Sequence, residues 1–173
     1  HVFQTNKLFH LKKMIDYKLH IPGPVNVSPE AYQAMTSPVM GHRSSDFVDL
    51  YNQCQPLLQT LFQTSDPVFI STSSAWGAME GAVRNLTHSK TLCCTCGAFS
   101  DKWLDVALRC GKNADALQAD WGSHIDPMNL DSRLATGEYD LVTLVHNEPS
   151  CGMMNPLEEI MQVLKKYPNV ISV

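Results

Sequence analysis

The sequence has few charged residues, no long apolar run and no excess of positive charge. Charged residues make up 17% of its 173 positions and hydrophobic residues 44%, which favours a well-packed globular protein over a disordered one. Because it contains no stretch of about 18 apolar residues, we expect no membrane-spanning segment. The net charge of −4 gives no reason to expect nucleic acid as a partner.

A secretory signal pattern is also lacking, and the six cysteines do not make a convincing metal motif. Cys93 and Cys96 have the spacing of a Cys-x-x-Cys pair, but the chain has no second pair. In an extended strand these two side chains point to opposite faces, which disfavours binding of one ion by both. We therefore predict no metal site, buried reduced thiols and a cytoplasmic protein, unless a terminal segment carries an organellar signal.

The polar stretch Ser71-Thr72-Ser73-Ser74 is the feature around which the rest is organised. We expect a strand over Val68–Ser71, and a helix over Ala75–Leu86 because its apolar residues recur at the helical period. The turn between them places hydroxyls and free backbone N–H groups at the positive end of a helix, which suits a phosphate. An ordinary serine N-cap is the alternative, and this stretch alone favours it.

Strands and helices alternate after this turn. The composition predicts strands over four later segments, with helices between them: Thr91–Cys96, Ala114–Ala119, Leu141–Val145 and Asn169–Val173. Asp126 and Asn155, each followed by a proline, are expected to cap two of the helices. This order predicts an α/β fold with a mostly parallel sheet that is covered by helices on both faces.

The segment before the turn is less regular. Ile21-Pro22-Gly23-Pro24 predicts a rigid extended loop, and Ser28-Pro29-Glu30 predicts a helix start. Apolar residues between Phe47 and Phe62 predict a long amphipathic helix, kinked or broken near Pro56. Residues 1–20 are expected to form an N-terminal arm; its part before Met14 is a targeting remnant, an upstream artefact or a disordered arm.

Five motifs together give the sequence a family resemblance. They are IPGPVNVSPE (21–30), GHRSSDF (41–47), STSSAWGAMEGAVRN (71–85), CGAFSDKW (96–103) and HNEPSCGMMNPLEEI (146–160). In this order and spacing the chain resembles the N-terminal half of a class V aminotransferase, most closely the serine/alanine–glyoxylate or pyruvate group. The resemblance implies a fold-type-I enzyme that depends on pyridoxal 5′-phosphate. It also implies that the enzyme is usually a homodimer with the active site at the subunit interface.

The resemblance assigns the cofactor phosphate to the turn already described. Ser73, Ser74 and Ala75 match the backbone amides that hold the phosphate, and Trp76 follows in the same turn, where its own N–H is available. Many relatives have glycine in place of Ser74, so a serine here must adopt a negative φ or be strained.

The ring and the substrate are assigned to other segments. Phe99 matches the aromatic residue that stacks on the pyridine ring, although its helical period alone favours a core position. Ser150 matches the serine that reaches the ring hydroxyl; a turn residue is the alternative. Gly23 lies where the family approaches the substrate carboxylate. The family usually has Thr or Ser where Pro149 stands, and Thr where Cys151 stands. This chain departs from the family pattern at both positions.

The remaining polar residues near these motifs receive no firm role. His42 and Arg43 are assigned either to substrate or partner contacts or to a solvated loop, and His146 fits a satisfied core histidine. In the family the Schiff-base lysine, the aspartate facing the pyridine nitrogen and the substrate arginine all follow the position of Val173. We therefore expect residues 21–173 to be the first part of the large domain, in a protein that continues beyond Val173.

The expected function is transfer of an amino group from serine or alanine to glyoxylate or pyruvate. Small amino acids and 2-keto acids are the implied substrates, and this chain alone, without the lysine, is expected to be catalytically silent. Two alternatives remain open: another class V enzyme, such as a cysteine desulfurase or a phosphonate aminotransferase, and a non-catalytic α/β domain that binds phosphate.

Overall fold

The computed structural model describes residues 17–173. The chain divides into two compact units, one that ends at Val68 and one that spans Phe69–Val173. Of the predicted N-terminal arm, residues 1–16 lie outside the described part of the chain, and residues 17–20 belong to neither a helix nor a strand.

The first unit contains two helices, each preceded by a capping serine. Helix α1 spans Pro29–Met35, and the Oγ of Ser28 accepts a hydrogen bond from the N–H of Ala31 (3.2 Å). Helix α2 spans Ser45–Phe62, and the Oγ of Ser44 accepts one from the N–H of Phe47 (3.3 Å). Both helices were predicted, and these hydroxyls satisfy first-turn donors that a helix leaves unpaired.

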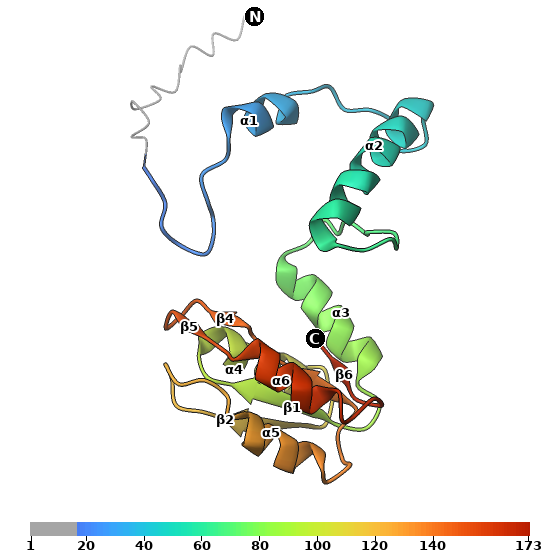
Figure 1. Ribbon diagram of the computed structural model, residues 1–173. Helices are drawn as coiled ribbons and strands as arrows, with labels where there is room; N and C mark the ends of the chain where they lie inside the picture. Colours follow the sequence, from blue (N-terminus) through green and yellow to red (C-terminus); the bar gives the residue numbers. More distant parts are fainter. Residues whose placement is uncertain (1–16) are drawn as a thin grey trace, which may run out of the picture. The chain divides into compact units, whose positions relative to one another are not determined.

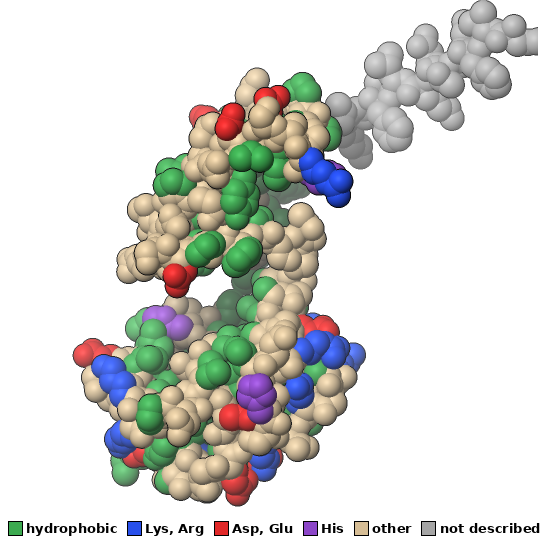
Figure 2. Space-filling model, turned by 90° about the vertical axis from the view of Figure 1, so that its right-hand side faces the viewer, with side chains coloured by type: hydrophobic (Ala, Val, Ile, Leu, Met, Phe, Trp, Pro, Cys, Tyr) green, Lys and Arg blue, Asp and Glu red, His purple; other side chains and the backbone are tan. Residues whose placement is uncertain are grey.

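Helix α2 differs from the prediction in two respects. It continues through Pro56 to Phe62, so of the predicted kink or break the break is wrong, and the kink stays a prediction. The predicted apolar stripe is not a buried face, because among the residues described here α2 contains no buried one. Leu57 and Leu61 are instead exposed. Figure 2 shows hydrophobic side chains, in green, at the surface of the protein.

The predicted strand over Val68–Ser71 is wrong, and the side chain of Gln55 explains part of the difference. Its Nε2 donates to the carbonyl of Val68 (2.8 Å), and its Oε1 accepts from the N–H of Val68 (3.0 Å). The backbone groups that a sheet ladder would use are therefore bonded to one side-chain amide of α2. Phe69 and Ile70, which follow, are exposed.

The second unit is the predicted α/β fold (Figure 1). Its central sheet has the order β2-β1-β3-β6, and all three neighbouring pairs are parallel. The four strands of this sheet are β1 (Thr91–Thr95), β2 (Ala114–Gln118), β3 (Leu141–Thr143) and β6 (Ile171–Ser172). Four helices flank them: α3 (Ala75–Leu86), α4 (Ala98–Arg109), α5 (Pro127–Leu134) and α6 (Leu157–Leu164).

The two faces of this sheet carry separate cores. Leu92 and Val142 pack with α5 and α6, whereas Cys93 packs with residues of α3 and α4 such as Val83 and Trp103. Alternating side chains along a strand reach opposite faces, so each helix pair covers one face. Cys96 belongs to the same core as Leu92, which confirms that it and Cys93 point to opposite sides.

The starts of two later helices use different devices. Asp126 caps α5 as predicted, because its Oδ1 accepts from the N–H of Met128 (2.8 Å). Asn155 does not cap α6. Its Oδ1 accepts from the N–H of Ile125 (2.8 Å) and its Nδ2 donates to the carbonyl of Val145 (2.7 Å), so it joins two loops instead.

A short antiparallel hairpin, which was not predicted, precedes α6. Its strands are β4 (Asn147–Glu148) and β5 (Met153–Met154), and residues 149–152 form the turn between them. Among the helices of residues 17–173, none combines the length and the apolar composition needed to cross a membrane.

Candidate functional site

Two loops meet at the carboxyl edge of the sheet. Strands β1 and β3 are parallel neighbours, so the segments that follow them leave the sheet on the same side. The loop after β1 leads into α4 at Gly97, and the segment after β3 leads into the hairpin with Glu148 and Ser150. Ligands of open α/β sheets bind at this edge, so these two loops form the candidate site.

The start of α3 is a helix N-terminus without a side-chain cap. Ser74 occupies the N-cap position with φ −64° and ψ 160°, yet in the described part of the chain no side chain makes a capping hydrogen bond there. The negative φ shows that a serine fits without backbone strain. The Oγ of Ser73 donates instead to the carbonyl of Ser74 (3.0 Å). The serine-cap alternative is therefore not supported. The N–H of Gly77 donates to the carbonyl of Ser74 (2.9 Å), and the N–H groups of Ala75 and Trp76, which no side chain of the described residues caps, are left for an anion.

Gly77, which the sequence analysis did not single out, is needed for this arrangement. A Cβ added at Gly77 would lie 2.6 Å from the Oγ of Ser73 and 2.9 Å from its Cβ. Real Cβ atoms do not approach other atoms so closely, so Ser73 rests on the first turn of α3 only because residue 77 has no side chain.

Trp76 joins this turn to α4. Its ring packs edge-on against Trp103, with 5.6 Å between the ring centroids and 65° between the planes. The ammonium of Lys102 lies 5.4 Å from the centroid of the Trp76 ring. The side chain of Trp76 is thus used in helix packing, and only its backbone N–H is left for a ligand. Lys102, another residue that the sequence analysis missed, brings a positive charge to this side of the turn.

Phe99 is not a core residue. The residue is 39% exposed, and the buried positions of α4 are Ser100, Trp103 and Ala107. The helical period predicted Phe99 as the first residue of the buried apolar face of α4, and that prediction is wrong. An aromatic ring exposed at the first turn of a helix, at the carboxyl edge of the sheet, is free to stack on a planar ligand.

Ser150 is held against the start of α4. Its Oγ accepts a hydrogen bond from the N–H of Ala98 (3.0 Å) and donates one to Oε1 of Glu148 (2.6 Å). The structure therefore brings together two segments that the sequence analysis had assigned to the same ligand. Ser150 lies in the hairpin turn, as the alternative expected, and these contacts in addition hold that turn against the start of α4.

Glu148 was missed by the sequence analysis, although it organises this junction. It is fully buried, and its carboxylate accepts hydrogen bonds from the N–H groups of Phe99 (3.3 Å) and Ser100 (2.9 Å) as well as from Ser150. Burial alone raises the pKa of Glu148, but the hydrogen bonds from Ser150 and Ser100 outweigh it and hold the pKa below its ordinary value.

The other predicted residues are placed as follows. Gly23 lies in the loop before α1, and its contact with substrate stays a prediction. His42 and Arg43 are exposed in the turn before α2, as a solvated loop requires. His146 is exposed, so the core-histidine interpretation is wrong; its carbonyl accepts from the N–H of Asn155 (2.8 Å).

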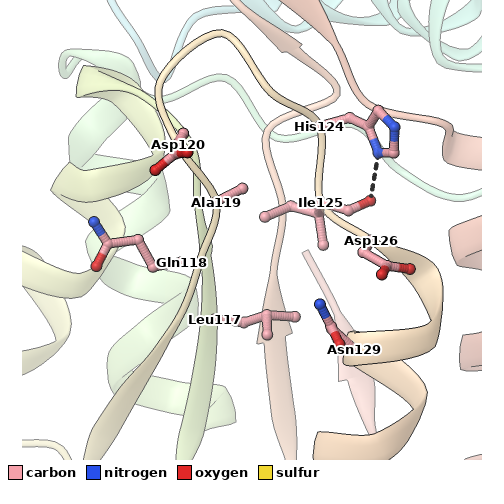
Figure 3. A pocket seen from close by; sticks show the side chains of 8 residues that line it. All are labelled: Leu117, Gln118, Ala119, Asp120, His124, Ile125, Asp126 and Asn129. Atoms are coloured by element: carbon pink, nitrogen blue, oxygen red, sulfur yellow. Dashed lines mark hydrogen bonds between the residues drawn. The ribbon is translucent and has the colours of Figure 1, made fainter.

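A cavity of about 310 Å³ opens at the carboxyl end of β2, apart from the predicted site residues (Figure 3). It is lined by Leu117, Gln118, Ala119, Asp120, His124, Ile125, Asp126 and Asn129. Two of its polar groups already have partners, because Asp126 caps α5 and Nδ1 of His124 lies 3.0 Å from the carbonyl of Ile125. The loop above it is tied to α4 by the Nε1 of Trp121, which donates to Asp101 (3.1 Å).

Solved structures with the same fold are aminotransferases. The chain superposes on an alanine–glyoxylate aminotransferase from Nostoc sp. with a TM-score of 0.79 and 28% identity, over 88% of this chain and 41% of the other. An aspartate aminotransferase from Thermus thermophilus gives the same TM-score and identity, over 88% and 43%. The fold is thus that of the aminotransferases.

The sequence comparisons narrow this class to a family. The profile of aminotransferase class V matches residues 26–173, and the chain belongs to that family. An uncharacterized aminotransferase from Methanocaldococcus jannaschii is 35% identical over 86% of this chain and 40% of its own. A serine–glyoxylate aminotransferase from Methylorubrum extorquens is 28% identical over 84% and 38%. The chain therefore spans about two fifths of the length of these relatives. Enzymes of this family depend on pyridoxal 5′-phosphate.

Proposed function

We propose that the protein is a pyridoxal-phosphate-dependent aminotransferase that moves an amino group from serine or alanine to glyoxylate or pyruvate. The relatives named serine–glyoxylate and alanine–glyoxylate aminotransferase support this choice of substrates. The observation that carries the proposal is the uncapped N-terminus of α3, which Trp76 packs onto the helix that bears the exposed Phe99.

The phosphate of the cofactor is assigned to the start of α3. Ser73, Ser74 and Ala75 would hold it through backbone N–H groups, with the N–H of Trp76 beside them. A dianion is favoured there by the partial positive charge of the helix end. The absence of a capping side chain in the described residues and the ammonium of Lys102 near Trp76 both support this assignment.

The ring of the cofactor is assigned to the junction of the two loops. Phe99 would stack on its face, and Ser150 would meet its ring hydroxyl. When bound, pyridoxal phosphate supplies the aldehyde and the electron-accepting ring that amino-group transfer requires. The residues of this chain orient that ring and exclude water from one face. The exposed Phe99 ring and the hydrogen bond from Ala98 to Ser150 support these roles.

We further propose that residues 21–173 form the first part of the cofactor-binding large domain, and that the protein acts as a homodimer. The match of the family over residues 26–173 supports the domain assignment. Gly23 is proposed to lie near the substrate carboxylate. The cytoplasmic location stays a prediction from the sequence.

Two measurements on the protein as its gene encodes it test this function. The first is a titration with pyridoxal 5′-phosphate, with inorganic phosphate as competitor; we expect saturable binding that phosphate weakens. The second measures the keto acid formed when serine is paired with glyoxylate or pyruvate, and when alanine is paired with glyoxylate. Saturable binding without any amino transfer supports the non-catalytic alternative, whereas sulfur release from cysteine supports a desulfurase. Failure to bind the cofactor contradicts the proposal itself.

A further inference from the structure

We infer that Glu148 is a positioning residue of the cofactor site. It holds the turn of Phe99 and the loop of Ser150 as one unit, and it fixes the Ser150 hydroxyl as a hydrogen-bond acceptor toward the ligand. The inference rests on the proposed function, because it takes the ring of pyridoxal phosphate as the ligand.

The first step is the set of donors that converge on one buried carboxylate. Oε1 of Glu148 accepts from the N–H of Phe99 (3.3 Å), from the N–H of Ser150 (3.2 Å) and from the Oγ of Ser150 (2.6 Å). Oε2 accepts from the N–H of Ser100 (2.9 Å). A fully buried carboxylate is costly unless its oxygens are bonded in this way. The Glu148 carboxylate thus collects four of the hydrogen bonds at this junction, and the hydroxyl of Ser150, which accepts from Ala98, adds a second link between the two loops.

The second step is the arrangement of hydrogen-bonding groups at Ser150. A serine hydroxyl has one proton to donate and two lone pairs that accept. Its proton is directed at Glu148, and one lone pair accepts from the N–H of Ala98. One lone pair remains, so Ser150 meets a ring oxygen only as an acceptor, and the ring hydroxyl has to supply the proton of that bond.

The third step is the lack of space around the junction. A Cβ added at Gly97 would lie 2.5 Å from Cγ and 2.6 Å from Cδ of Glu148, and 2.7 Å from the Oγ of Ser150. The φ of Gly97 is 172°, an extended value open to any residue, so close approach alone requires the glycine. Glu148 and Ser150 are therefore held tightly against the backbone that leads into α4.

Glu148→Gln tests the clamp, because it keeps the shape of the side chain but replaces one oxygen by an amide donor. Either orientation of the amide leaves at least one of the N–H groups of Phe99, Ser100 and Ser150 facing another donor. We expect faster hydrogen exchange at the amides of Phe99 and Ser100, measured without cofactor on the full chain. Glu159→Gln, on the exposed first turn of α6, is the matched control and should leave both rates unchanged.

Ligand affinity tests the acceptor role. We expect the full chain to bind pyridoxal phosphate about five-fold more tightly than an analogue with hydrogen in place of the ring hydroxyl, as one hydrogen bond allows. This ratio should fall toward one in Ser150→Ala, which keeps the carboxylate and serves if the Gln variant does not fold. It should also change in Glu148→Gln, whereas a purely stabilising role would lower the melting temperature and leave the ratio as it was.

The outcomes separate this inference from the proposed function. If the parent binds pyridoxal phosphate and its ratio is not altered by Ser150→Ala or by Glu148→Gln, the inference is wrong and the function stands. If the parent does not bind pyridoxal phosphate, the proposed function fails, and the acceptor role fails with it. Unchanged exchange at Phe99 and Ser100 in Glu148→Gln overturns the clamp whatever the ligand does.

Discussion

The backbone N–H of Ser100 donates a 2.9 Å hydrogen bond to Glu148, which lies 48 residues later in the chain. This bond joins the first turn of α4 to the hairpin strand β4, two elements that share no regular pairing. Because the acceptor is a buried carboxylate, the junction depends on that group being ionised.

Acid should weaken the fold through Glu148. The pKa of Glu148 in the folded protein is below its ordinary value of 4.5, because the bonds from Ser150 and Ser100 outweigh burial. Its contribution to stability is therefore present above about pH 4.5 and is lost as pH falls through the folded-state pKa. Melting temperatures measured from about pH 7 to about pH 3 should fall more steeply for the parent than for Glu148→Gln. Asp115 and Asp131, whose pKa values are also lowered, are present in both proteins, so equal slopes would contradict this prediction.

Gly77→Ala should separate ligand binding from stability. The new methyl group would displace Ser73 from the first turn of α3, so we expect affinity for pyridoxal phosphate to fall by about ten-fold. Gly81→Ala is the matched control, because a Cβ there meets nothing within 4 Å in the described residues. It should raise the free energy of unfolding by about 0.5–1 kcal/mol and leave affinity unchanged. Equal affinities for the two variants would show that Ser73 does not shape the site.

Ser74→Glu should abolish most phosphate binding. A carboxylate at the N-cap would stand where the phosphate is proposed and repel it, while Ser74→Gln adds similar bulk without charge. Titration with inorganic phosphate should show a modest loss for Gln and a far larger one for Glu. If the Glu variant binds as well as the Gln variant, the start of α3 is not the phosphate site.

Phe99→Leu should loosen the cofactor with little effect on the fold. Stacking of aromatic rings contributes about 0.5–1.5 kcal/mol beyond area burial, so affinity should fall by a factor of about two to ten. Because Phe99 is partly exposed and belongs to neither buried core, the melting temperature without cofactor should change little. A lower melting temperature with unchanged cofactor affinity would show that Phe99 acts as a core residue and not as a stacking residue.

Lys102→Met should reduce the affinity for phosphate. The affinity of the variant should also depend less on salt concentration. The ammonium near the Trp76 ring is the charge that the substitution removes, and exposed charges are screened at physiological ionic strength. Lys165→Met, at the end of α6, changes the net charge equally and is the control. Equal phosphate affinities in the two variants would show that Lys102 does not contribute to the site.

The fold was largely predictable because its signals are local. The apolar period gave α3 its bounds, Ala75–Leu86, and β-prone runs located the strands of the sheet. The strand expected at Val68–Ser71 failed because Gln55, 13 residues earlier, takes the backbone groups of Val68. Asn155 failed as a cap for a similar reason, since its amide bonds to Ile125 and Val145. Such partners are set by tertiary structure.

The residues proposed to contact the ligand could be proposed from the sequence. The residues that hold them in place could not. Small polar residues before a helix carry a sequence signal, so Ser73 could be proposed from the residues themselves. Phe99 was proposed from the family resemblance, against its helical period. Glu148 carries none, because a lone acid in a polar loop reads as solvated. The closest signal was its position two residues before Ser150. Gly77 and Gly97 are required by close approach, which becomes visible only when Ser73 and Glu148 are in place.

The central strand β1 sets a limit on how this protein can change in evolution. The side chains on its two faces pack into two separate cores, with Cys93 in one and Cys94 in the other. A substitution at either position disturbs one core and leaves the other intact. Insertion or deletion of a single residue between Thr91 and Thr95 would exchange the two faces and disrupt both at once. We expect this segment to keep its length across relatives even where its residues differ, and length variation to concentrate in exposed connections such as residues 120–124.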